Sequence, residues 1–264
     1  MESISSSASA TARARSIDIN LGNHQRHAKA AKIVGSFNTW AFKREQPSDP
    51  ALLNRFVMRA LLRQQPLSFV LYWGKGPRSK IAEPDIQCLD YLGSLCARIK
   101  SIYAKGALIS LVLTDTHATL NGHPEGETAE YHGEIACEAR KRGFEHYALG
   151  ELTAAAGELV KAEDCPSPSA EILEQLAGSA MRWYRGAGAP EDGARRYYKM
   201  NMMEKKVMEL FFPSSVFATF NGSEHRELFP DRLPIFYMYS LRRGTSVKPW
   251  FLPCPDPKEI ALAS

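Results

Sequence analysis

The sequence predicts an α/β protein with a mostly parallel sheet flanked by helices, and three observations lead to this prediction. Two short runs, LSFVLYW (Leu67–Trp73) and LISLVL (Leu108–Leu113), are apolar at nearly every position, as in strands buried on both faces. Apolar residues recur at helical intervals from Pro84, and a second helical pattern covers residues 128–142. Because each helix must return over the sheet before the next strand pairs, this order favours parallel strands with right-handed crossovers.

The other elements follow from the spacing of apolar residues and from breaker residues. Residues from about 28 to 64 have helical spacing, and Pro66 separates them from the first strand. Gly106 ends the helix that starts at Pro84, and Gly143 ends the next one. GAGAPEDGA, residues 186–194, marks a sub-boundary within the domain. The segments beyond it predict a C-terminal α+β extension: a helix at Tyr197–Phe211, strands in SVFATF and IFYMYSL, and an extended PWFLPCPDP.

Composition limits the class of protein. A chain of 264 residues, 44% hydrophobic and 23% charged, can bury a full core, so we expect one domain over residues 28–264 after a disordered tail at 1–27. The net charge of +4 is spread along the chain, which disfavours nucleic acid as a partner. No apolar stretch reaches the roughly 20 residues of a membrane span. Five widely spaced cysteines without a CxxC pair indicate a reducing, cytoplasmic location.

Polar loops follow both predicted central strands. The first loop is KGPRSK, Lys75–Lys80, and the second is TDTHATLNGH, Thr114–His123. In open parallel sheets, ligands bind outside the carboxyl ends of the strands. We therefore expect the two loops to lie at one edge of the sheet and to form the functional site.

The second loop offers one carboxylate and two imidazoles. Asp115 and His117 are two residues apart, so in an extended segment both side chains point the same way, and a bend at Asn121-Gly122 would bring His123 near them. This arrangement would suit a metal or heme ligand with a supporting partner, or an acid–base pair. The ordinary alternative is that Asp115 caps the next turn and that both histidines are solvated.

The first loop supplies three cations. Lys75, Arg78 and Lys80 lie beside two glycines and could hold a phosphate, a heme propionate or a substrate carboxylate. The loop lacks a phosphate-binding glycine motif, so a solvated basic loop is the alternative.

Large aromatic residues and two cysteines complete the candidates. A flat cofactor could use Tyr72, Trp73, Trp250 and Phe251 as walls, although core packing also explains them. Cys165 and Cys254 each precede a proline, a context that heme-thiolate ligands share. We rank both cysteines below His117 as iron ligands, because neither lies at the predicted sheet edge.

Several stretches in order resemble the isocyanide synthase superfamily, which includes bacterial pyoverdine-chromophore-type enzymes and a yeast spore-wall enzyme. These stretches span about residues 60 to 252: PLSFVL before a basic loop, PD, LDYLGSLCARIKSIYAKGALISLVLTD, Tyr131, FFPSSV and Pro249-Trp250. The resemblance implies a Rossmann-like α/β domain that acts on a free amino acid, with its site over the two loops.

The chain also departs from the synthase pattern. Synthases look like Pro-Ala-Phe-Pro-Ala-Lys-Ser after the first strand, where this chain has YWGKGPRS, so either Arg78 corresponds to the family lysine or that lysine is lost. They tend to carry Arg or Gln, Ser and His on a late strand, where this chain has Phe217, Thr219 and Asn221. YWGKG-x-R and TDTHA-x-x-NGH look more like a divergent branch associated with heme-dependent N-hydroxylation of arginine in siderophore and antibiotic biosynthesis.

The leading hypothesis from the sequence is therefore a heme-dependent oxygenase or peroxygenase that hydroxylates a nitrogen of free L-arginine, with heme b as cofactor. His117 would be the axial iron ligand and His123 its reserve, with His132 and His225 left open. Asp115 would orient that ligand or hold the guanidinium, and Glu224 is a second candidate for this clamp. Propionates or the substrate carboxylate would bind Lys75 and Arg78, and the walls would be Tyr72, Trp73 and Trp250.

Two alternatives stay open. The first is a cofactor-free isocyanide synthase that joins an amino acid to ribulose 5-phosphate through imine chemistry. Its phosphate would bind Lys75, Arg78 and Lys80, while Asp115 or His117 moved protons. The second is a non-catalytic amino-acid-binding protein. All three hypotheses imply a small amino-acid ligand, and each allows a homodimer.

Overall fold

A single parallel sheet organises the protein. The computed structural model describes residues 24–37, 46–74, 79–161, 165–184 and 186–238, without the side chains of residues 179, 182, 183 and 224. Within these ranges five strands pair in the order β3-β2-β1-β4-β5, and every pair is parallel. The α/β class with a helix-flanked parallel sheet is therefore confirmed. The strands are β1 (Leu67–Trp73), β2 (Ala107–Leu113), β3 (Glu145–Ala148), β4 (Val216–Thr219) and β5 (Ile235–Tyr237).

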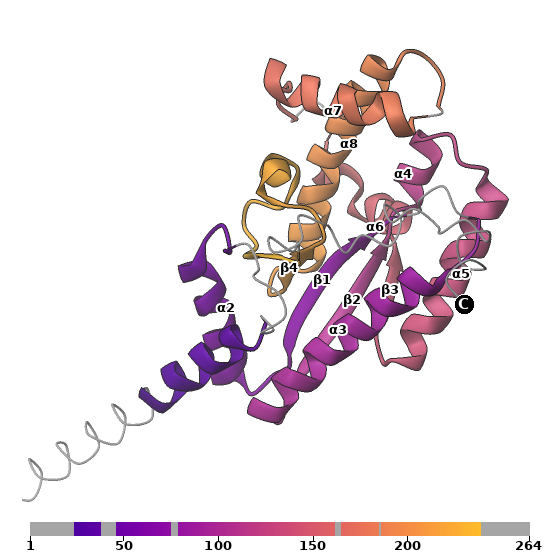
Figure 1. Cartoon of the computed structure of the whole chain (residues 1–264). Helices are drawn as coiled ribbons and strands as arrows, with labels where there is room; N and C mark the ends of the chain where they lie inside the picture. The colour runs from indigo at the N-terminus through magenta and orange to yellow at the C-terminus, as the bar shows by residue number, and fades with distance from the viewer. Residues whose placement is uncertain (1–23, 38–45, 75–78, 162–164, 185, 239–264) are drawn as a thin grey trace, which may run out of the picture.

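Helices lie on both faces of the sheet (Figure 1). The predicted helices after β1 and β2 are confirmed with small shifts in their bounds. The segment predicted as helical from about 28 to 64 forms two helices, and the first starts at residue 24, before the predicted end of the tail at 27. The helices are residues 24–35, α2 (Pro50–Arg63), α3 (Glu83–Ile102), α4 (Asp115–Leu120), α5 (Glu125–Lys141), α6 (Leu149–Ala156), α7 (Ala170–Trp183) and α8 (Pro190–Phe211), with 3-10 turns η1 (Gly157–Leu159) and η3 (Ser223–Leu228).

The two central strands run side by side over their whole length. Leu67 pairs with Ala107 at one end and Trp73 with Leu113 at the other. Gly106, with φ of 68°, turns the chain into β2 in a conformation that L side chains rarely adopt. Because the register is complete, both strands end at the same edge, and the segments that follow them start together.

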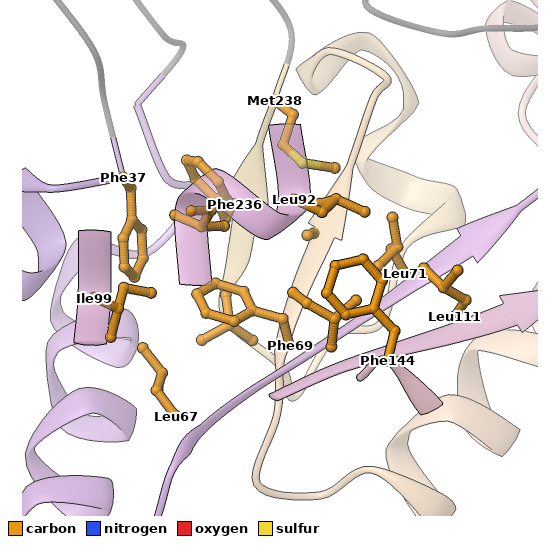
Figure 2. Packing of buried hydrophobic residues seen from close by; sticks show 14 of the residues in the cluster. Phe37, Leu67, Phe69, Leu71, Leu92, Ile99, Leu111, Phe144, Phe236 and Met238 are labelled. Carbon is orange, nitrogen blue, oxygen red and sulfur yellow. The ribbon is translucent and has the colours of Figure 1, made fainter. Parts of the chain in front are cut away.

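Apolar side chains cover both faces of the sheet. On one face a buried cluster joins the strands to residues 24–37, α2, α3 and α5, and Figure 2 shows its centre. There the Phe69 ring lies 5.3 Å from the Phe37 ring, and the Phe37 ring lies 5.0 Å from that of Phe236, measured between centroids. A second cluster, which includes Val70, Val112 and Phe217, packs against α6, α7 and α8. Both faces of the sheet are covered by buried apolar side chains, which explains why the sequences of β1 and β2 are nearly continuous apolar runs.

The C-terminal part differs from the prediction in detail. Pro190, within the glycine- and proline-rich stretch, is the first residue of α8, so the end of that stretch is helical. The strands beyond it do not form a separate layer, because β4 pairs with β1. β3, α6 and α7 were not predicted. PWFLPCPDP lies outside the described residues. Among the helices that the structure describes, none has both the length and the apolar character to cross a membrane.

Candidate active site

The predicted site lies where β1 and β2 end. Thr114 follows β2 directly and donates its backbone N–H to the carbonyl oxygen of Trp73 at 3.0 Å, which joins the two strand ends. α4 begins at the next residue, Asp115. After β1, Lys75 and Arg78 lie outside the described residues, so their expected roles stay predictions. Lys80 is mostly exposed and forms an ion pair with Glu130 of α5 at 3.2 Å.

The segment after β2 is helical, which corrects the expectation of an extended loop. Residues two apart on a helix point in different directions, so Asp115 and His117 separate. The Asp115 side chain contacts Gly150 of α6, and the His117 side chain contacts Glu204 of α8. His123 lies beyond the end of α4, where its backbone N–H donates to the Ala118 carbonyl oxygen at 3.0 Å. The structure therefore does not gather the three side chains around one atom.

Asp115 caps a helix. The expected alternative role was to cap the turn that follows it, but the helix that it caps is α6. Its Oδ1 accepts the backbone N–H of Gly150 at 2.9 Å. The residue at the N-cap position of α6 is Ala148, which has no side-chain acceptor. A Cβ at Gly150 would lie 2.8 Å from Asp115 Oδ2, so the glycine leaves room for the carboxylate. Asp115 thus fixes α4 against α6.

A buried carboxylate paired with a partly buried imidazole is the centre of the site. His117 Nε2 lies 2.5 Å from Glu204 Oε2, and Thr116 Oγ1 donates to Glu204 Oε1 at 2.7 Å. The side chain of Glu204 is 2% exposed and that of His117 is 14% exposed. A buried carboxylate needs compensating partners, and here each oxygen has one. Within the described part of the chain, His117 Nδ1 has no hydrogen-bond partner, so it is the nitrogen left for a ligand.

Aromatic rings flank this pair. The Tyr197 ring lies 5.3 Å from the His117 ring, edge to face, and the Tyr72 ring lies 6.1 Å from it. Phe217 lies behind Tyr72 at 5.3 Å. Burial and then the charge of Glu204 raise the pKa of Tyr72 well above its ordinary value and that of Tyr197 to about 12. Both phenols are therefore neutral at physiological pH.

α8 supplies the part of the site that sequence reasoning missed. Tyr197, Asn201, Glu204 and Met208 follow each other at spacings of four, three and four residues, so they share one face of the helix. Asn201 turns back and donates its side-chain N–H to the Tyr197 carbonyl oxygen at 2.8 Å. The sequence feature that could have revealed this part of the site is the helical spacing of Glu204. It places the carboxylate on the same helix face as Tyr197 and Met208, where it is buried with them.

The remaining predicted residues lie elsewhere. Trp73 is next to Tyr72 in a strand and points to the opposite face, so the two do not form one wall. Trp73 Nε1 donates to the Tyr131 hydroxyl at 3.2 Å, and that hydroxyl donates to the buried carboxylate of Asp85 at 2.9 Å. Cys165 donates its thiol to the Lys161 carbonyl oxygen at 3.7 Å. Outside the described residues lie Trp250, Phe251, Cys254 and the side chain of Glu224.

The residues around His117 do not fit heme. Glu204 occupies Nε2, and Nδ1 adjoins the ring carbon that bears Cβ, so a planar macrocycle at Nδ1 would meet the Cβ of His117 and the α4 backbone. Tyr72 and Tyr197 flank the same ring. Among the described residues, no three His, Cys, Asp or Glu side chains gather as the ligands of a metal ion without a macrocycle would. We therefore assign His117 no role as an iron ligand.

Comparisons with known proteins support the fold. No family model matches the chain, and no curated protein matches its sequence. Its structure is similar to that of the PvcA protein from Pseudomonas aeruginosa, with a TM-score of 0.62 and 14% identity over 84% of this chain and 87% of that one. Tyrosyl-tRNA synthetase from Archaeoglobus fulgidus, solved with L-tyrosine, gives a TM-score of 0.47 at 14% identity over 78% and 63%, too low to carry an argument. The chain therefore has a fold similar to that of PvcA.

Proposed function

We propose that this protein is an enzyme that acts on a free amino acid, with the His117–Glu204 pair as its proton-transfer group. The reaction we propose is of the isocyanide-synthase type, in which the amino nitrogen joins the carbonyl carbon of a pentulose phosphate. The observation that carries this proposal is the buried pair at the carboxyl ends of the central strands. The fold similarity supports an enzyme of this kind, and the sequence resemblance supplies the reaction type.

The pair suits the first step of such a reaction. An ammonium group must lose a proton before its nitrogen can attack a carbonyl carbon, and the resulting carbinolamine must gain a proton on oxygen before it loses water. The products are a protonated imine and one water molecule. His117 can do both through Nδ1, because Glu204 binds Nε2 and leaves the other ring nitrogen to take up and return the proton. Thr116 holds the other oxygen of Glu204 and so keeps the carboxylate in line with the ring.

The phosphate of the second substrate would bind the basic loop after β1. Lys80 is at the described end of this loop, with its ammonium exposed and paired to Glu130. Lys75 and Arg78, which lie outside the described residues, stay the predicted phosphate ligands on the evidence of the sequence.

The test is consumption of ribulose 5-phosphate. Purified protein is incubated with each of the twenty L-amino acids and ribulose 5-phosphate, and mass spectrometry follows the sugar phosphate and any new nitrogen-containing product. We expect consumption with at least one amino acid, and a loss on the order of 100-fold in His117→Gln and Glu204→Gln. His146→Gln is the matched control, because this histidine lies on β3 beside Arg140 and outside the site.

Three results would contradict the proposal in different ways. Turnover at the wild-type rate in a folded His117→Gln variant would remove the pair from the chemistry. Amino-acid binding without any consumption of the sugar phosphate would indicate a binding protein. A Soret band together with hydroxylation of arginine would restore the heme hypothesis.

A further inference from the structure

The hydroxyl of Tyr72 is buried without a hydrogen bond to any residue that the structure describes. Tyr72 is the penultimate residue of β1, and its ring faces His117 on the α8 side of the sheet. Burying a hydroxyl without a partner is costly, and native proteins rarely leave one so. Its position beside the His117–Glu204 pair suggests that the missing partner belongs to a ligand.

The charges around this hydroxyl select the kind of ligand. After burial, the charges of Glu204 and Glu209 raise the pKa of Tyr72, and both side chains are carboxylates. Glu209 keeps its position because its Oε1 accepts the backbone N–H groups of Asp231 and Arg232 at 2.6 and 2.8 Å. A negative potential repels a carboxylate or a phosphate and attracts a cation.

The rings add to this preference. The rings of Tyr72 and Tyr197 lie beside His117, the ring of Phe217 packs against Tyr72, and aromatic faces attract cations. Because both phenols stay protonated, the Tyr72 oxygen offers lone pairs without adding a charge. An ammonium group, which has three N–H donors and no acceptor, complements such a surface.

We propose that Tyr72 is a substrate-contacting residue whose hydroxyl oxygen accepts a hydrogen bond from the substrate's ammonium group and holds that nitrogen beside His117. This assignment rests on the proposed function, since it places the nitrogen that reacts. One N–H of the ammonium binds Tyr72, which leaves another to pass its proton to His117 Nδ1. The substrate carboxylate then lies away from Glu204.

The experiment measures an amine probe against its anionic counterpart. Propylammonium chloride and sodium propionate have chains of equal length and opposite charge, and each is titrated to about 50 mM at constant ionic strength by calorimetry. We expect saturable binding of propylammonium and none of propionate. Tyr72→Phe should raise the Kd of propylammonium about tenfold, as expected for one hydrogen bond to a charged group. Tyr198→Phe is the control, because its hydroxyl donates to Glu227 Oε1 at 2.6 Å outside the site.

A second measurement excludes a merely structural effect. Without ligand, Tyr72→Phe should unfold at the wild-type temperature or above it, because it removes a hydroxyl that has no partner among the described residues. Tyr198→Phe should unfold at a lower temperature, because Glu227 loses its donor. Equal Kd values for propylammonium in wild type and Tyr72→Phe would overturn the proposal, as would propionate binding or the absence of propylammonium binding.

The outcome is separable from that of the proposed reaction. Tyr72-dependent binding of propylammonium without consumption of ribulose 5-phosphate keeps this ammonium site and refutes the reaction. Turnover in Tyr72→Phe with the wild-type KM for the amino acid refutes the ammonium site and keeps the reaction.

Discussion

The contact between Asp115 and Gly150 yields a prediction in which one substitution changes the sign of its effect. Asp115 Oδ1 accepts the Gly150 N–H at 2.9 Å, and a Cβ on Gly150 would lie 2.8 Å from Oδ2. The residue at the N-cap position of α6 is Ala148, and its side chain accepts no hydrogen bond from the helix. A methyl group at residue 150 therefore cannot coexist with the carboxylate in its present place.

The magnitudes follow from the cap and from helix propensity. Asp115→Ala removes the cap and its interaction with the helix dipole, which costs about 1–2 kcal/mol of the free energy of unfolding. Gly150→Ala displaces the carboxylate and loses the same cap, but alanine returns about 0.5 kcal/mol of helix propensity in the first turn. The net cost is about 1 kcal/mol. With Asp115→Ala already present there is no carboxylate to displace, so Gly150→Ala should stabilise by about 0.5 kcal/mol.

Urea unfolding of the wild type, both single variants and the double variant measures this coupling, which we expect to be about 1.5 kcal/mol. Asp115→Asn serves as a control, because its amide oxygen can still accept the Gly150 N–H. If Gly150→Ala has the same effect in both backgrounds, within about 0.5 kcal/mol, then the carboxylate does not act as the cap.

Three further predictions concern the rest of the fold. Tyr131→Phe should destabilise by about 1–3 kcal/mol in urea unfolding, because its hydroxyl joins a buried indole to a buried carboxylate. Burial raises the pKa of Tyr197 and Tyr198 to about 12, above the unfolded value near 10. Their stabilisation should therefore be complete below pH 10 and be lost as pH rises toward 12, and a stability–pH profile that is flat there would contradict this. Burial likewise raises the pKa of Cys96 to about 11. At pH 8, peptide mapping of thiol modification should therefore show Cys96 reacting on the order of 100-fold more slowly than exposed Cys137, and equal rates would contradict the burial.

The central strands were predictable because of where they lie. β1 and β2 are buried on both faces and have neighbouring strands on both sides. Nearly every position is therefore apolar, and the run can be recognised in the sequence. β3 is the opposite case, because Glu145–Ala148 is a four-residue edge strand with half-exposed side chains. Such a segment has neither a continuous apolar run nor a clear alternation.

α4 shows how tertiary contacts override local preference. DTHATL contains two β-branched threonines and follows a strand, so an extended loop was a reasonable expectation. In the structure α4 packs against α5, α6 and α8. Asp115 and His117 each bind a different one of these helices, and those contacts need a helical spacing. The ends of β1 and β2 were therefore predicted at one edge of the sheet, while the side chains of Asp115 and His117 were assigned the wrong directions.

Glu204 was hidden for a different reason. It lies in the run MEKKVMEL, where alternating charges suggest a solvated helix face. Its partners Thr116 and His117 are 88 and 87 residues away in the chain, so only the fold brings them together. The periodicity of α8 places Glu204 on a buried face, but it does not say which residues lie opposite.

The cost of that burial is the reason to connect the pair with function. Removing a carboxylate and an imidazole from water is expensive, and apolar residues of similar volume would often give equal or greater stability at such a position. Fold stability alone therefore does not require Glu204 at the centre of α8 or His117 opposite it. A site that must take up and release a proton does require them, because the carboxylate sets the imidazole in one orientation. The same reasoning applies to the Tyr72 hydroxyl. Its burial without a described partner lowers the stability of the free protein, and a hydrogen-bond donor on the proposed ligand would restore that stability.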